Sequence, residues 1–139
     1  MTTPEAKIRL ALYQAVEDLA VSGLNTSTQV AWPNVSFNPP DDHIYVSVQF
    51  EPNVPERIGI GELERLSGLL MINVFWSKNG GERLAVERAS LIADQFPTDR
   101  LISADGYRVR ITQRSTVSGM MEQDAFIQVP VTVWWEAYI

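Results

Sequence analysis

The chain has 139 residues, no cysteine, and 11 lysine and arginine residues against 17 aspartate and glutamate residues, for a net charge of -6. This length is typical of one domain, expected to span 1–139, and it can bury a core without disulfides or metal. The composition excludes thiolate catalysis and Cys-ligated zinc, and it argues against general DNA or RNA binding, which usually needs a basic protein.

The first predicted element is a helix over residues 2–24. Thr2 or Thr3 can cap its start, Pro4 suits the first turn, and Gly23 can end it. Apolar residues recur at helical spacing and predict the buried stripe: Ile8, Leu12, Ala15 and Leu19. The polar, proline-broken segment 25–42 follows and is expected to be a loop, and no role is assigned to it.

Residues 43–51 alternate between apolar and polar side chains, which predicts a half-buried strand. Segment 52–68 contains two prolines, three glycines and a charged centre, and is expected to be a long loop that is functional or mobile. Residues 69–77 are apolar on both faces. A strand of this kind is central in its sheet or is covered by another chain.

Residues 79–96 predict a second helix that Pro97 stops. Its expected stripe is Leu84, Ala85, Arg88, Ala89, Ile92 and Phe96. A hairpin follows over 99–115 with Asp105-Gly106 as its turn, and then a loop over 116–124. The element order predicts an α+β fold, with a single mixed or antiparallel sheet of about four to five strands packed against two helices.

The last predicted strand, "AFIQVPVTVWWEAYI", has two different faces. Trp135 continues the core face that runs from Ile127 to Val133. The other face predicts a contact with a neighbouring subunit and carries Phe126, Pro130, Trp134 and Tyr138. Because proline lacks an N–H, this strand is expected at a sheet edge or with a bulge. The alternative is that the first helix, or another element of the chain, covers Trp134.

No pattern predicts catalysis or a cofactor. His43, the only histidine, follows two aspartates, which favours a turn at a strand start over a metal site. No nucleophile elbow or phosphate-binding loop is present, and the close glycines of 52–68 indicate a flexible loop. No signal peptide or bilayer-spanning apolar run is visible, so no membrane partner is expected.

Three arginines near the predicted hairpin are unusual in an acidic protein. Arg108, Arg110 and Arg114 are expected on one strand face. One interpretation places them against acidic groups of another subunit, where arginine is over-represented. The alternative is a solvated face with cross-strand ion pairs.

The chain resembles the tail terminator-like proteins of long-tailed bacteriophages. The resemblance rests on the strand "GLLMINVFWSKNGG", the amphipathic helix closing in "DQFP", the segment "ADGYRVRI", and the valine-rich last strand ending in aromatic residues. It covers nearly the whole chain in element order. In that family a small α+β subunit assembles into a ring, typically a hexamer.

The resemblance implies a non-enzymatic virion protein that caps the tail tube, ends tube polymerisation and offers the head-joining surface. Its partners would be further copies of itself, the tail-tube protein and head–tail connector proteins, in the host cytoplasm during assembly and then in the virion tail. By element order, 52–68 and 117–124 would be the loops of the ring lumen and faces. The first loop carries the tube or lumen candidates Glu56, Arg57, Glu62, Glu64 and Arg65.

Negative charge suits a conduit through which DNA can pass without binding specifically. Two alternatives stay open: a head–tail neck or connector component, and a small non-phage enzyme or ligand carrier.

Overall fold

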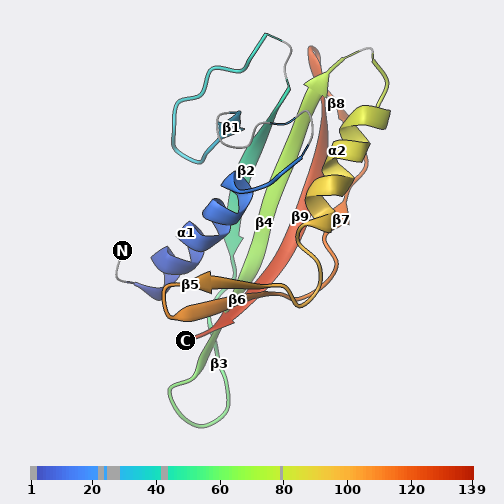
Figure 1. Ribbon diagram of the computed structural model, residues 1–139. Coiled ribbons are helices and arrows are strands. Elements are labelled where there is room, and N and C mark those ends of the chain that lie inside the picture. The colour runs from blue at the N-terminus through green and yellow to red at the C-terminus, as the bar shows by residue number, and fades with distance from the viewer. Residues whose placement is uncertain (1–2, 22–23, 25–28, 42–43, 79) are drawn as a thin grey trace.

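The computed structural model describes all residues except 1–2, 22–23, 25–28, 42–43 and 79. In the described part the chain forms two helices and a nine-stranded sheet (Figure 1). The elements are α1 (Pro4–Glu17), β1 (Val30–Ala31), β2 (Tyr45–Pro52), β3 (Glu56–Arg57), β4 (Glu64–Ser77), α2 (Arg83–Asp94), β5 (Leu101–Ala104), β6 (Tyr107–Ile111), β7 (Thr116–Val117), β8 (Met121–Glu122) and β9 (Phe126–Tyr138).

The main strand order is β1-β2-β4-β9-β6-β5, with β3 added to β4, and β7 and β8 added to β9. The β1–β2 pair is parallel and the other pairs are antiparallel. The predicted α+β class, with a mixed sheet and two helices, is therefore confirmed. The predicted strand number is wrong, because β1, β3, β7 and β8 are two-residue strands within segments that the sequence analysis assigned to loops.

Strands β4 and β9 form the centre of the sheet and pair continuously from Arg65↔Tyr138 to Ser77↔Phe126. The central position of the apolar strand at 69–77 is confirmed, although β4 already begins at Glu64. Strand β9 is paired on both sides, with β4 on one and β6, β7 and β8 on the other. The expectation for this strand was a sheet edge or a bulge, and the sheet edge is wrong.

Pro130 fits inside β9 because of a break in its partner strands. Strand β7 pairs with Thr132 and Val131, and β8 pairs with Gln128 and Ile127, so Pro130 falls between the two ladders. Its carbonyl accepts a hydrogen bond from the Ser118 N–H at 2.9 Å. Because proline has no N–H, it returns no hydrogen bond to Ser118, and the pairing of β7 with β9 ends at this point.

Helix α1 begins as predicted, with the Thr3 hydroxyl accepting a hydrogen bond from the Ala6 N–H at 3.3 Å and Pro4 in the first turn. It ends at Glu17, earlier than predicted, and Leu19 is buried beyond its end. The Gln95 amide bonds both backbone groups of Ala20, at 3.4 and 3.1 Å, which draws the chain out of helical geometry towards the end of α2. The predicted cap Thr2 and end Gly23 lie outside the described residues.

Helix α2 buries Ala85, Ala89, Ile92 and Ala93, and Phe96 is buried just after its end. The predicted place of Leu84 in this stripe is wrong, since its side chain is 40% exposed. Leu84 precedes Ala85 by one residue and so lies about 100° around the helix from the stripe. The small alanines face the sheet and let the helix approach it closely.

Both helices lie on one face of the sheet (Figure 1), which we call the covered face. The alternation of β9 puts the predicted core residues there, including Trp135 at 3% exposure, so their assignment to the core is confirmed. The ring of Trp135 stacks on Phe50 of β2, with centroids 5.3 Å apart. Apolar side chains of β4 complete this layer: Leu66, Leu70, Ile72, Val74 and Trp76.

Gly68, which the sequence analysis placed at the end of a loop, lies within β4 opposite both Pro52 and Trp135. A Cβ at this position would clash with the Glu51 carbonyl oxygen and stand 2.9 Å from the Pro52 Cα. The glycine is therefore required by close strand packing. The predicted Asp105-Gly106 turn is confirmed, with φ values of 48° and 97° between β5 and β6.

Candidate assembly surfaces

The face of the sheet that points away from α1 and α2 is the first candidate surface, and we call it the open face. No helix of the described ranges lies on it (Figure 1). Cross-strand pairs Leu69–Trp134 and Met71–Thr132 occupy its middle. Its side chains differ in kind from those of the covered face, because charged groups gather at one end and aromatic rings at the other.

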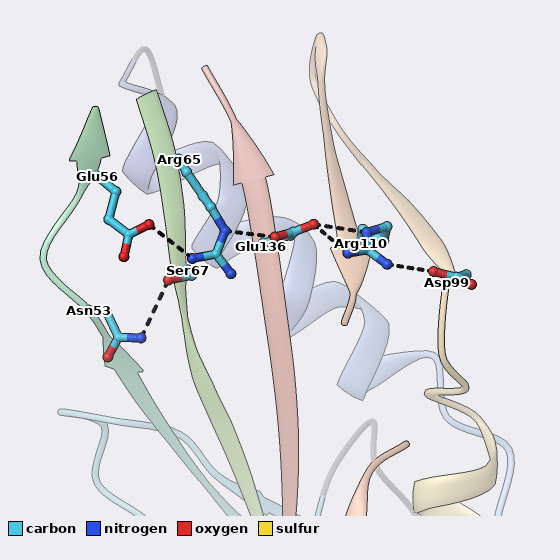
Figure 2. A network of polar contacts seen from close by, with 7 residues as sticks. All are labelled: Asn53, Glu56, Arg65, Ser67, Asp99, Arg110 and Glu136. Atoms are coloured by element: carbon cyan, nitrogen blue, oxygen red, sulfur yellow. Dashed lines mark hydrogen bonds and ion pairs between the residues drawn. The ribbon is translucent and has the colours of Figure 1, made fainter. Parts of the chain in front are cut away.

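Glu136 is the centre of the charged end, and only 5% of its surface is exposed. Figure 2 shows its carboxylate between two arginines from neighbouring strands. Arg65 of β4 donates from Nε at 2.7 Å, and Arg110 of β6 donates from Nε at 2.9 Å and Nη2 at 2.6 Å. Outer carboxylates extend the network, with Glu56 at 3.3 Å from Arg65 and Asp99 at 2.5 Å from Arg110.

This network keeps Glu136 ionised. Burial by itself would raise the pKa of Glu136, but the hydrogen bonds and positive charges of Arg65 and Arg110 outweigh burial and hold this pKa below its ordinary value. The same hydrogen bonds raise the pKa of both arginines. The cluster therefore ties together three strands, β4, β9 and β6, through charge-assisted hydrogen bonds.

A row of aromatic rings forms the other end of the open face. Phe37 lies 5.0 Å from Tyr45 of β2, and Tyr45 stacks on Phe75 of β4 at 4.6 Å. Phe75 meets Phe126 of β9 edge-to-face at 5.1 Å. The row crosses three strands and leaves the rings half-buried, as is common for surfaces that contact a partner.

All four aromatic and proline candidates of β9 lie on the open face. Tyr138 is 48% exposed, Phe126 and Trp134 are half-buried, and Pro130 is buried among its neighbours. The alternative cover for Trp134 was the first helix or another element of the chain, and of these α1 lies on the opposite face. These residues are thus brought together on one surface, and their contact with another subunit remains a prediction.

The three arginine candidates are not equivalent. Arg110 is engaged within its own chain by Glu136 and Asp99, which is the cross-strand ion pairing of the alternative interpretation. Arg108 lies on β6 and is exposed, and it makes no ion pair among the described residues. Arg114 lies beyond the end of β6 and is also exposed, so the three do not share one strand face.

The segment predicted as a long loop, 52–68, is a hairpin that projects from the sheet (Figure 1). Glu56 and Arg57 of β3 pair with Arg65 and Glu64 of β4, and the Ile58 N–H donates to the Leu63 carbonyl at 2.9 Å. Gly59 and Gly61 have φ values of 65° and 132°, which a tight tip requires. We call residues 54–63 the arm.

The five charged candidates of this segment all lie on the arm or at its base. Glu56 and Arg65 form an ion pair, and Arg57 donates to the Gly61 carbonyl at 2.9 Å. Glu62 and Glu64 are exposed. Sequence reasoning missed the arm's apolar side chains, which are exposed: Val54, Ile58, Ile60 and Leu63.

The predicted loop at 116–124 also differs from expectation, because β7 and β8 within it pair with β9. Lys78 fixes its far end by donating to the Gln123 and Asp124 carbonyls, at 3.0 and 3.4 Å. Met120 and Met121 are exposed on this segment. It is thus a rim along β9 that pairs with this strand at two places, instead of a free loop.

Nothing in the described part of the chain groups three or more His, Cys, Asp or Glu side chains where they could hold a metal ion. His43 lies outside the described residues, so its predicted place at a strand start is not described. Neither α1 nor α2 is long and apolar enough to cross a membrane.

Comparisons with known proteins bear on the fold and on the family of this chain. One solved structure superimposes with a TM-score of 0.80 over 97% of this chain and 96% of its own, at 24% sequence identity. At that identity the likeness shows the fold alone. No curated protein sequence matches the chain. The family model described as phage tail terminator protein matches residues 7–135, so the chain belongs to the phage tail terminator family.

Proposed function

We propose that this protein forms a ring at the end of the phage tail tube, stops tube polymerisation and offers the surface to which the head joins. The observation that carries the proposal is the family match over residues 7–135. Family membership makes the chain a phage tail protein that interacts with other tail and head proteins. Ring formation, capping and head joining are the finer roles that we add.

The molecule has surfaces suited to such assembly. Exposed or half-buried apolar groups occur both on the open face and on the arm, at separate places of one chain. Contacts between two different patches of identical subunits are heterologous, and they close into rings when the rotation allows it. We propose a hexamer, following the family resemblance, with the whole chain acting as one domain.

We assign the open face to the subunit–subunit contact through Trp134, Tyr138, Phe126 and Pro130. Tryptophan and tyrosine are enriched among residues that dominate interface energy. Arg108 and Arg114 extend this contact, because both are exposed cations in a protein of net charge -6. Arg110 contributes by holding β6 against β9, since its guanidinium already binds Glu136.

We assign the arm and the rim at 117–124 to contacts with the tube and around the lumen. The charged side chains of the arm, Glu62 and Glu64 among them, are exposed for such contacts. The acidic charge of the chain would keep passing DNA from binding to the ring. No catalytic role, cofactor or membrane partner is proposed, and the protein would assemble in the host cytoplasm and remain in the virion tail.

The experiment that tests this function is a phage lacking the gene, examined by electron microscopy. We expect tail tubes of uncontrolled, mostly excessive length, which are restored to normal length by the gene supplied in trans. Tails of normal length that fail to join heads would instead indicate a neck or connector role. Normal, infectious virions without the protein would overturn both assignments.

A further inference from the structure

The arm presents apolar side chains that the described part of the chain leaves exposed to solvent. Ile60 at the tip has a relative exposure of 106%, and Val54, Ile58 and Leu63 are also exposed. A hairpin with so few contacts to the rest of the chain would gain stability if these groups were buried. Clustered exposed apolar groups on a protein generally mark a binding surface.

An apolar pocket of about 230 Å³ lies between α1 and the strands, beside the root of the arm. Its buried wall consists of Ile8, Leu66 and Trp135, and Phe50 adds an aromatic side. Exposed residues stand at its opening, including Glu5 and Arg9 of α1. An apolar cavity of roughly 150 Å³ already accommodates a benzene molecule, so this pocket is large enough for an isoleucine side chain.

One charged group at the pocket opening, Arg9, is opposite in charge to Glu62 of the arm. Arg9 lies over the Phe50 ring at 4.5 Å, and it forms no ion pair among the described residues. Glu62 is exposed two residues beyond Ile60 and has no ion pair in the same part of the chain. An arm entering the pocket can therefore bring the Glu62 carboxylate to the Arg9 guanidinium, which within its own chain lies over the Phe50 ring.

We propose that Ile60 of one copy docks in the apolar pocket between α1 and the strands of the next copy, with Glu62 beside Arg9. The occupant is a second copy of this chain, because the size, polarity and charge of the arm match the pocket. The arm cannot fill its own pocket in this structure, since Ile60 is fully exposed. This inference rests on the proposed ring, for which it supplies one heterologous contact that each subunit both gives and receives.

The absence of cysteine makes disulfide trapping unambiguous. Purified Ile60→Cys/Glu5→Cys protein is oxidised across a range of concentrations and analysed on non-reducing gels, with mass spectrometry of the linked peptides. We expect a reducible ladder of multimers joined between positions 60 and 5, because each subunit carries both halves of the contact. Either single variant should stop at dimers.

The matched control is Ile60→Cys/Leu101→Cys, because Leu101 is an exposed leucine on β5, away from the pocket. If this control and the test variant give the same multimers, the contact is random collision and the proposal is wrong. A disulfide within one chain would also overturn it, since the arm would then fold back on its own pocket.

A charge exchange tests the second part of the contact. In the Ile60→Cys/Glu5→Cys background, Arg9→Glu or Glu62→Arg alone should reduce the yield of the ladder. Both together should restore it, because each interface again pairs opposite charges. Circular dichroism melts of each variant show whether the subunit still folds. If the ladder yield of the doubly exchanged protein falls by the sum of the two single losses, Arg9 does not pair with Glu62.

The proposed function can fail independently of this contact. A ladder from purified protein, together with normal tails in the gene-deletion phage, would support the arm–pocket contact and reject the capping role. Tails that require the protein, together with no specific ladder, would support capping and reject the arm–pocket contact.

Discussion

Trp134 and Trp135 are neighbours in sequence and lie on opposite faces of the same sheet. Trp135 is buried among the apolar residues of the covered face, whereas Trp134 is half-buried on the face without a helix. The covered face is apolar almost throughout, while the open face carries a charged network and a row of aromatic rings. Successive residues of β9 therefore contribute alternately to the core, which stabilises the fold, and to a surface that is available for partners, because they point to opposite faces of the sheet.

The largest expected effect comes from the two tryptophans. Trp135→Ala should lower the free energy of unfolding by about 3–5 kcal/mol, since it empties a buried aromatic site. Trp134→Ala should change it much less and should instead impair assembly. Thermal melts of the isolated subunit measure the first effect, and tail morphology measures the second.

If the two tryptophan variants destabilised the isolated subunit equally, the two faces would not differ in their contribution to the fold. Trp134 would then be a core residue in energetic terms despite its place on the open face. Trp134→Phe is a suitable control for Trp134→Ala, because it keeps an aromatic ring at this position while reducing the contact area.

Charge reversal on β6 compares two arginines of the open face, Arg110, which binds Glu136 and Asp99, and Arg108, which is exposed. Arg110→Glu should destabilise the subunit clearly, though less than Trp135→Ala, because it places a third carboxylate beside Glu136 and Asp99. Arg108→Glu, two residues away on the same strand face, should leave the melting temperature nearly unchanged and weaken assembly, and high salt should partly mimic it. Equal melting temperatures for the two variants would show that the Glu136 network contributes little to the fold.

The pH dependence of stability isolates Glu136. Because its pKa is held below the ordinary value of 4.5 in the folded protein, its contribution is complete above that pH and is lost as pH falls through the folded pKa. Glu136→Gln should cost roughly 1–3 kcal/mol near neutral pH, since charge-assisted hydrogen bonds are lost. The difference in unfolding free energy between wild type and variant should shrink below about pH 4.5. Urea denaturation at several pH values measures it, and a constant difference would argue against an ionised Glu136.

The smallest effect on stability is expected at the arm. Replacing 58–63 by two glycines should change the free energy of unfolding by roughly 0.5 kcal/mol or less, as for other exposed positions. The same deletion should give overlong tails in the phage. Wild-type tail lengths from this variant, with the protein present in the tails, would remove the arm from the capping mechanism.

The local pattern of the sequence was sufficient for the main helices and long strands. Alternation in Tyr45–Pro52 and Phe126–Tyr138 predicts which side chains share a face, and the Thr3 cap and the Asp105-Gly106 turn follow from local hydrogen bonding and backbone preference. The same alternation identified the aromatic and proline residues that β9 contributes to the open face. These features depend on residues a few positions apart, so a single sequence contains their signal.

The tertiary structure alone decided which strands meet. The two-residue strands β1, β3, β7 and β8 are too short to produce a period, and their pairing with longer strands turned predicted loops into a hairpin arm and a rim. The same pairing placed β9 inside the sheet and brought Arg65 and Arg110 to Glu136 across 71 and 26 residues of sequence. Alternation specifies the face of a side chain but not its neighbour on the next strand, because strand register is set by contacts between distant segments.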